Sequence, residues 1–228
     1  MVILTVSNIE KIYEGARGGV AALKGVSLTA EVGDFIALMG PSGCGKSTLL
    51  HILGGIDRPT RGTVSLDGIQ LDSLNEEAMT AIRRKKIGFV FQFFNLLPTL
   101  TVLENIALPL MLDGANEGDA NRRAQELLTR VGMAQRATHY PAELSGGEMQ
   151  RAAIARALIA NPQIVLADEP TGNLDSKNSE QVMQLLAEIN RDLKVTFILA
   201  THSEEAARFA KRVIRLRDGL IESVVGNR

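Results

Sequence analysis

Gly40-Pro-Ser-Gly-Cys-Gly-Lys-Ser-Thr48 is the stretch of sequence that decides the fold of this chain. It follows an apolar run, Phe35–Met39, and precedes a helical run, Thr48–Leu53. It matches the pattern G-x-x-x-x-G-K-[ST], in which backbone N–H groups and the positive end of a helix dipole surround phosphate oxygens. The alternative is an ordinary glycine-rich turn, but the full motif and both flanking elements occur together. The sequence therefore predicts a phosphate-binding loop.

The chemistry of this loop assigns a role to its polar side chains. Lys46 is predicted to neutralise the β- and γ-phosphates of a nucleotide, and the Ser47 hydroxyl to ligate Mg²⁺. Cys44 is the sole cysteine, and we expect its backbone amide, rather than its side chain, to face the phosphates. The loop residues predicted to bind ATP are Gly40, Pro41, Ser42, Gly43, Cys44, Gly45, Lys46, Ser47 and Thr48.

A second apolar run, Ile164–Ala167, ends in two carboxylates, Asp168 and Glu169. Ligand-binding groups of a parallel sheet gather at the carboxyl ends of its strands. Asp168 is therefore predicted to hold Mg²⁺, and Glu169 to orient or deprotonate a water that attacks the γ-phosphate. Acidic residues also commonly begin loops after strands, but this alternative loses weight when a phosphate loop is present.

Two further polar residues follow predicted strands and are expected at the same edge of the sheet. His202 comes after Val195–Ala200 and is a candidate to hydrogen-bond a γ-phosphate oxygen. Gln92 comes after Ile87–Phe91 and is a candidate to sense Mg²⁺ or water. A lone histidine is more often a surface or capping residue than a catalytic one, so that alternative stays open for His202.

Strand and helix patterns alternate in the last third of the chain, which is typical of βαβ units and a parallel sheet. The first third is rich in short strand patterns, and Asp218-Gly219 indicates a hairpin near the end. Between them, helical spacing over Glu117–Val131 and Gly147–Ala160 indicates a helical insert. We predict an α/β core over residues 1–92 and 161–228, an antiparallel β region near the start, and a helical part over residues 93–160.

Composition limits the classes of protein to consider. The chain has 228 residues, of which 45% are hydrophobic, and a net charge of −1. A sizeable core is expected, and the charge gives no argument for nucleic acid or an anionic membrane as the main partner. No apolar run approaches the roughly 18–20 residues that span a bilayer. We therefore expect a cytoplasmic protein that attaches to a membrane only through a partner.

Leu144-Ser-Gly-Gly-Glu-Met-Gln150 begins the second predicted helix of the insert. Ser145 is a natural N-cap, and the two glycines allow a backbone to approach an anion closely. Local physics alone favours a capped helix start without a ligand.

Taken together, these motifs resemble the nucleotide-binding subunit of an ABC transporter over essentially the whole chain. In chain order they are Gly40–Thr48, Gln92, Leu144–Gln150, Ile164–Glu169, Asn173–Asp175 and His202. The resemblance implies a single P-loop NTPase (RecA-like) domain with a parallel-sheet core, an antiparallel β subdomain and a helical signature subdomain. It also implies ATP and Mg²⁺ as cofactors, and a homodimer that forms on ATP binding.

In that family two subunits pack head to tail, so each ATP lies between one phosphate loop and the signature helix of the other subunit. The residues that the resemblance places at the partner's ATP are Ser145, Gly146, Gly147 and Asp175. Tyr13 lies where the family stacks an aromatic ring on adenine. Position 148 is Glu, where many members of the family have Gln. The catalytic Glu169 is present, so neither the phosphate-loop part nor the signature-helix part of the ATP site is predicted to be inactive.

Finer detail resembles the bacterial lipoprotein-releasing and macrolide-exporter ATPases. The segments that carry it are Gly54–Asp57, Gln92–Asn105 and Asp168–Asp175. This implies an ATPase on the cytoplasmic face of the inner membrane that drives a separate permease. Phe93–Pro98 would then line the groove that receives the permease, although these residues could instead be core of the helical part.

Three other classes of protein are alternatives to this interpretation. ABC ATPases of DNA repair or translation carry long insertions or two ATPase halves, for which this chain has no room. A P-loop kinase would have no use for the Leu144–Gln150 motif. A signalling or scaffold subunit of a cell-division-type ABC complex, in which nothing is transported, is the alternative that the sequence separates poorly.

Overall fold

The computed structural model describes residues 1–14 and 19–226, and its centre is a six-stranded sheet in the order β10-β9-β3-β8-β7-β6. The strands from β9 to β6 run parallel, and β10 pairs antiparallel with β9. This confirms the predicted α/β class. Their bounds are β3 Phe35–Met39, β6 Ile87–Val90, β7 Ile164–Asp168, β8 Thr196–Thr201, β9 Arg212–Arg217 and β10 Leu220–Gly226.

A second, antiparallel sheet has the order β2-β1-β4-β5. Its alternating apolar residues face inward, with Leu4 opposite Leu66 and Val6 opposite Val64. Strands β1 and β2 are each 12 residues long, because their backbone pairing continues through their polar ends. The bounds are β1 Val2–Tyr13, β2 Val20–Glu31, β4 Arg61–Leu66 and β5 Ile69–Gln70.

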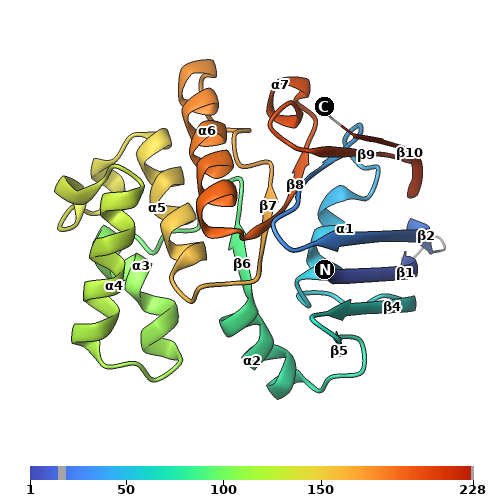
Figure 1. Ribbon diagram of the computed structural model, residues 1–228, viewed down its shortest axis with the longest axis horizontal. Coiled ribbons are helices and arrows are strands. Elements are labelled where there is room, and N and C mark those ends of the chain that lie inside the picture. Colours follow the sequence, from blue (N-terminus) through green and yellow to red (C-terminus); the bar gives the residue numbers. More distant parts are fainter. Residues whose placement is uncertain (15–18, 227–228) are drawn as a thin grey trace.

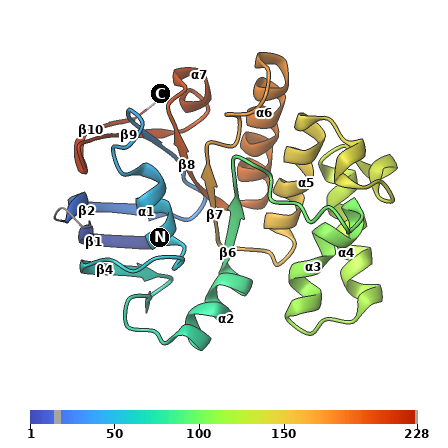
Figure 2. The ribbon, with the colours of Figure 1, turned by 180° about the vertical axis from the view of Figure 1, so that it is seen from behind.

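The helices divide into two groups, and Figures 1 and 2 show one of the groups at the end of the molecule away from the antiparallel sheet. Around the central sheet lie α1 Lys46–Leu53, α2 Glu76–Lys86, α6 Ser176–Leu193 and α7 Glu204–Ala207. At the far end from the antiparallel sheet lie α3 Val102–Leu112, α4 Glu117–Arg130, α5 Gly146–Leu158 and two short 3-10 turns, η1 Ala134–Arg136 and η2 Pro141–Glu143.

Two apolar cores cover the two faces of the central sheet. Phe197 and Leu199 of β8 face one core together with α5 and α6, whereas Ile198 and Ala200 face the other with α1 and the antiparallel sheet. Successive residues of a strand point to opposite faces. The continuous apolar run of β8 is therefore explained by burial on both sides, as in other covered parallel sheets.

Helix α3 is the main element that apolar periodicity did not reveal. It contains Pro109, and its N-terminus is a capping box in which Thr101 accepts a hydrogen bond from the Glu104 amide while Glu104 accepts from Thr101. The Thr-x-x-Glu spacing was the available signal. The predicted hairpin is confirmed, because Asp218 and Gly219 both have positive φ between β9 and β10.

No helix within the described ranges, 1–14 and 19–226, has the length and apolar character that crossing a membrane requires.

Candidate nucleotide-binding site

The phosphate loop joins β3 to α1 in a conformation that requires glycine at two positions. Gly40 and Gly45 have φ angles of 154° and 107°. A Cβ added to Gly40 would lie 2.2 Å from the Leu216 carbonyl oxygen, and one added to Gly45 would lie 2.6 Å from the Ala22 carbonyl oxygen. Any side chain at either position would therefore displace neighbouring backbone and change the shape of the loop.

Lys46, the first residue of α1, is buried against the loop that precedes it. Its ammonium group donates hydrogen bonds to the carbonyl oxygens of Gly40, at 2.7 Å, and Pro41, at 3.1 Å. Its charge is thus already inside the cradle in which phosphate oxygens are expected. Cys44 packs its side chain into the apolar core, as expected if only its backbone faces the phosphates.

Ser47 and Asp168, predicted as magnesium ligands, lie together. The Ser47 hydroxyl donates to Asp168 Oδ1 at 3.1 Å, although the two residues are 121 positions apart. Burial raises the pKa of the Asp168 carboxyl, and the Ser47 hydrogen bond opposes that rise only in part. A hydroxyl beside a half-buried carboxylate suits a hard divalent cation, which prefers oxygen ligands and keeps several water or phosphate oxygens of its own.

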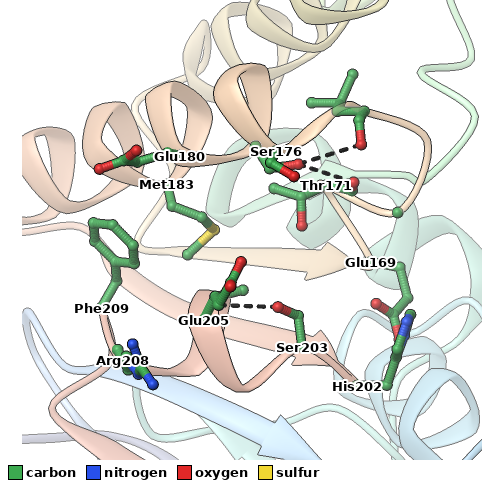
Figure 3. A pocket seen from close by; sticks show the side chains of 14 residues that line it. Glu169, Thr171, Ser176, Glu180, Met183, His202, Ser203, Glu205, Arg208 and Phe209 are labelled. Atoms are coloured by element: carbon green, nitrogen blue, oxygen red, sulfur yellow. Dashed lines mark hydrogen bonds and ion pairs between the residues drawn. The ribbon is translucent and has the colours of Figure 1, made fainter.

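Glu169 and His202 form a second pair at the same edge of the sheet. His202 Nδ1 lies 2.9 Å from Glu169 Oε1, and the two side chains lie side by side in Figure 3. Glu169 has a φ of 45°, which is uncommon for a residue other than glycine, and its amide is held by the Ala200 carbonyl at 2.9 Å. Backbone strain of this kind concentrates at functional sites, because surrounding structure must maintain it.

The Glu169–His202 pair opens onto a cavity of about 730 Å³ between α6 and α7. Polar and apolar side chains line it, among them Glu180, Met183 and Phe209. Residues 40–48 contribute nothing to its lining, so this cavity is not the phosphate cradle. It lies next to the start of α6.

Gln92, the candidate to sense Mg²⁺ or water, is hydrogen-bonded to Asn173. Gln92 Nε2 donates to Asn173 Oδ1 at 3.4 Å, and Asn173 Nδ2 donates to the Gln92 carbonyl at 2.9 Å. Asp175, two residues further on, caps α6 by accepting from the Asn178 amide at 2.8 Å. The Gln92 loop and the loop before α6 are therefore fastened together. Asn173 was not singled out by the sequence as a partner of Gln92.

Tyr13 lies at the end of β1 and is held close to the start of α1. Its hydroxyl donates to Asp57 Oδ2 at 2.8 Å, and Asp57 also accepts from Lys11 at 2.6 Å. The Lys11 ammonium lies 4.8 Å from the centre of the Tyr13 ring. The Tyr13 side chain also interacts with the side chain of Thr48. Lys11 and Asp57 are thus residues that fix the orientation of the aromatic ring, and sequence reasoning gave neither of them a role.

Ser145 caps α5, as predicted, by accepting a hydrogen bond from the Glu148 amide. The two glycines that follow pack against the loop before α6 and its first turn. A Cβ on Gly146 would lie 3.2 Å from Leu174, and one on Gly147 would lie 2.5 Å from the Asn178 side chain. Close packing is therefore a sufficient local reason for both glycines, besides their predicted role towards a partner's nucleotide.

Arg156, on the buried side of α5, was also missed by sequence reasoning. Its guanidinium donates to the carbonyl oxygens of Phe94, at 2.8 Å, and of Asn95. Phe94 and Asn95 both have positive φ, so this arginine supports a strained part of the Gln92 loop. Nothing in the local sequence distinguishes Arg156 from Arg151, the other arginine of the helix.

Comparison with known proteins agrees with this geometry. The family described as ABC transporter matches residues 23–172. The lipoprotein-releasing system ATP-binding protein LolD of Geobacter metallireducens is 49% identical over 219 residues, which cover 96% of this chain and 97% of LolD. The macrolide export ATP-binding/permease protein MacB of Bdellovibrio bacteriovorus is 49% identical over 97% of this chain, which spans only 34% of MacB.

The fold is also that of solved ABC cassettes. A dimeric structure of MJ0796, a protein of Methanocaldococcus jannaschii, in a post-hydrolysis state with ADP and Pi superposes with a TM-score of 0.92 at 45% identity, covering 99% of both chains. The family match, the alignments that cover nearly the whole chain, and the shared fold all agree. This chain belongs to the ABC transporter family, as one of its ATP-binding and ATP-hydrolysing subunits.

Proposed function

We propose that the chain acts as a homodimer that binds two ATP molecules, each between one subunit's phosphate loop and the other's α5 N-terminus. Ser145, Gly146 and Gly147 then bind the γ-phosphate in trans, Asp175 couples the two sites, and residues 93–160 form a helical subdomain. The solved dimers of MJ0796 support this arrangement. Each chain carries the same two parts of the site, a phosphate loop and the start of α5, which suits a closed two-fold dimer.

The observation that carries the proposed chemistry is the Glu169–His202 pair next to Ser47 and Asp168 at one sheet edge. Glu169 orients the attacking water and accepts its proton, and His202 steadies the γ-phosphate. Lys46 turns from its own loop carbonyls to the β- and γ-phosphates. Ser47 and Asp168, together with Gln92, would hold Mg²⁺, which would supply positive charge to neutralise the phosphoryl oxygens.

We further propose that the chain drives a separate membrane permease from the cytoplasmic face of the inner membrane. Support comes from apolar side chains that the fold leaves exposed: Phe93 is 73% exposed, Leu97 44% and Leu112 66%. Leu96 of the same segment packs against the core instead, so only part of Phe93–Pro98 is free to contact a partner. With a net charge of −1, no nucleic-acid partner is expected.

The similarity to LolD and MacB supports an exporter, or a complex that extrudes lipoproteins, peptides or glycolipids. A cell-division-type signalling complex is the alternative, in which ATP binding relays a signal and nothing is moved. The identity of the permease that associates with the chain would distinguish transport from signalling.

The proposed role of Glu169 is tested by Glu169→Gln. We expect ATP binding to remain and kcat to fall by at least about a hundredfold, the usual contribution of a general base. Glu180→Gln, which changes a carboxylate of the adjoining cavity, is the control and should hydrolyse ATP like the unchanged protein. Steady-state ATPase assays and equilibrium nucleotide binding measure both; normal turnover by Glu169→Gln would remove Glu169 from this role.

The same Glu169→Gln protein, tagged and recovered from native membranes with ATP, tests the partner. A stoichiometric permease with a large extracytoplasmic domain is the expected result, and its identity by mass spectrometry narrows the cargo. A permease bound to cell-wall hydrolase regulators would favour signalling. Recovery without any membrane protein would overturn the transport proposal and leave the ATPase intact.

A further inference from the structure

The first turn of α5 carries a carboxylate next to the serine that is proposed to meet ATP. Glu148 Oε2 accepts hydrogen bonds from the Ser145 amide, at 2.9 Å, and from the Ser145 hydroxyl, at 2.7 Å. The Glu148 amide in turn donates to Ser145 Oγ. The two residues thus form a closed capping box.

This arrangement conflicts with binding a triphosphate. The Ser145 hydroxyl has one proton, which it donates to Glu148, and a phosphate oxygen would need the same proton. The carboxylate also places a full negative charge within hydrogen-bonding distance of that hydroxyl. Juxtaposed like charges at an interface are repulsive, so the charge of Glu148 weakens this helix start as an anion site unless another group offsets it.

Arg136, in the η1 turn outside α5, provides that offset. Its Nε donates to Glu148 Oε1 at 2.8 Å, and its Nη1 lies 3.2 Å from His139 Nε2. Hydrogen bonds from Ser145 and from Arg136 lower the pKa of Glu148 to about 2. The Glu148 side chain is only 19% exposed, so solvent alone screens its charge poorly.

We propose that Arg136 is a positioning residue for ATP-driven dimerisation: it neutralises the charge of Glu148 and fixes the orientation of that carboxylate at the start of α5 through its Oε1 atom. The inference rests on the proposed function, in which Ser145 binds the partner's ATP. The Arg136–Glu148 pair then replaces the neutral glutamine that many family members have at position 148.

The test follows ATP-dependent dimerisation by sedimentation at low salt, with every variant built on Glu169→Gln. Arg136→Met should require roughly tenfold more ATP for half-maximal dimer, the size of effect that an unbalanced, partly buried charge produces. Adding Glu148→Gln should restore dimerisation, because glutamine closes the capping box without a charge. Raising the salt concentration should also shrink the defect.

Arg130→Met is the matched control. Arg130 is similarly exposed, at 40% against 43% for Arg136, and pairs with Asp192 at the far ends of α4 and α6. It should dimerise like the parent, and thermal unfolding of all variants checks that they are folded.

Three results would count against the inference. Normal dimerisation of Arg136→Met, or a defect that Glu148→Gln does not relieve, would overturn it while leaving the proposed function standing. A Glu169→Gln parent that stays monomeric at saturating ATP would instead overturn the proposed dimer, and this inference with it.

Discussion

At the scale of single residues, Asp168 has a carboxyl group in a half-buried position that disfavours its charged form. Asp168 is half-buried and its pKa is raised by that burial, yet the proposed chemistry requires it ionised. A carboxyl whose pKa is raised by folding binds its proton more tightly in the folded state. Its contribution to stability is therefore fully present below its ordinary pKa of 3.8, and it is lost as pH rises through the raised value.

We therefore predict that Asp168→Asn stabilises the nucleotide-free protein at pH 7.5 by about 1 kcal/mol, as neutral replacements at functional sites often do. The gain should vanish near pH 3, where aspartic acid is itself neutral. ATP hydrolysis should be lost, because asparagine is a poor magnesium ligand. Urea unfolding at both pH values, without nucleotide or Mg²⁺, measures the difference, and a less stable Asp168→Asn protein at pH 7.5 would contradict the argument.

At the scale of elements, α5 does more than present Ser145. Its half-buried Arg156 donates to two carbonyl oxygens of the Gln92 loop, and Asn173 is hydrogen-bonded to Gln92. The loop that leaves β6 is thus fastened both to the helical part and to the start of α6. A change in the position of α5 is therefore expected to move Gln92 relative to Ser47 and Asp168.

Replacing Arg156 tests this fastening. Arg156→Met should lower the free energy of unfolding by about 2 kcal/mol, since hydrogen bonds to a charged donor contribute about 1.5–3 kcal/mol and the carbonyls lose their partner. Arg156→Lys keeps the charge but cannot fork across both oxygens, so it should recover only part of that loss. Denaturant unfolding gives both values, and full recovery by lysine would show that the forked geometry does not matter.

At the scale of the whole molecule, the same apolar residue types occur both in the buried core and on the exposed surface. Phe197 is completely buried, with its ring centre 5.5 Å from that of Phe35, whereas Phe93 is 73% exposed. Phe197→Ala should lower the free energy of unfolding by about 3–5 kcal/mol. Phe93→Ala, the same chemical change at the surface, should alter it by no more than about 0.5 kcal/mol.

Calorimetry of the two alanine variants provides the comparison. Co-purification then tests the proposed contact of Phe93 with the permease. The Phe93→Ala protein should be stable but should recover less permease from membranes. A stability loss at Phe93 as large as that at Phe197 would mean that the exposed segment is core after all.

The sequence by itself determined the phosphate loop, the acidic pair after β7, the order of strands and helices in the last third, and the Ser145 cap. Each depends on local spacing. A glycine pattern between a strand and a helix, and polar residues at the end of an apolar run, both consist of residues that are close together in the sequence. Helix α3 was also readable from Thr101 and Glu104, although Pro109 obscured its apolar pattern.

Only the tertiary structure decided which distant groups meet. The attachment of Gln92 to Asn173, the forked contact of Arg156 and the Arg136–Glu148 pair all join residues from different elements. Such pairings follow from how the strands order themselves in the sheet and how α5 packs on it. No local propensity encodes that packing, because its free energy comes from burying surfaces that are remote in sequence.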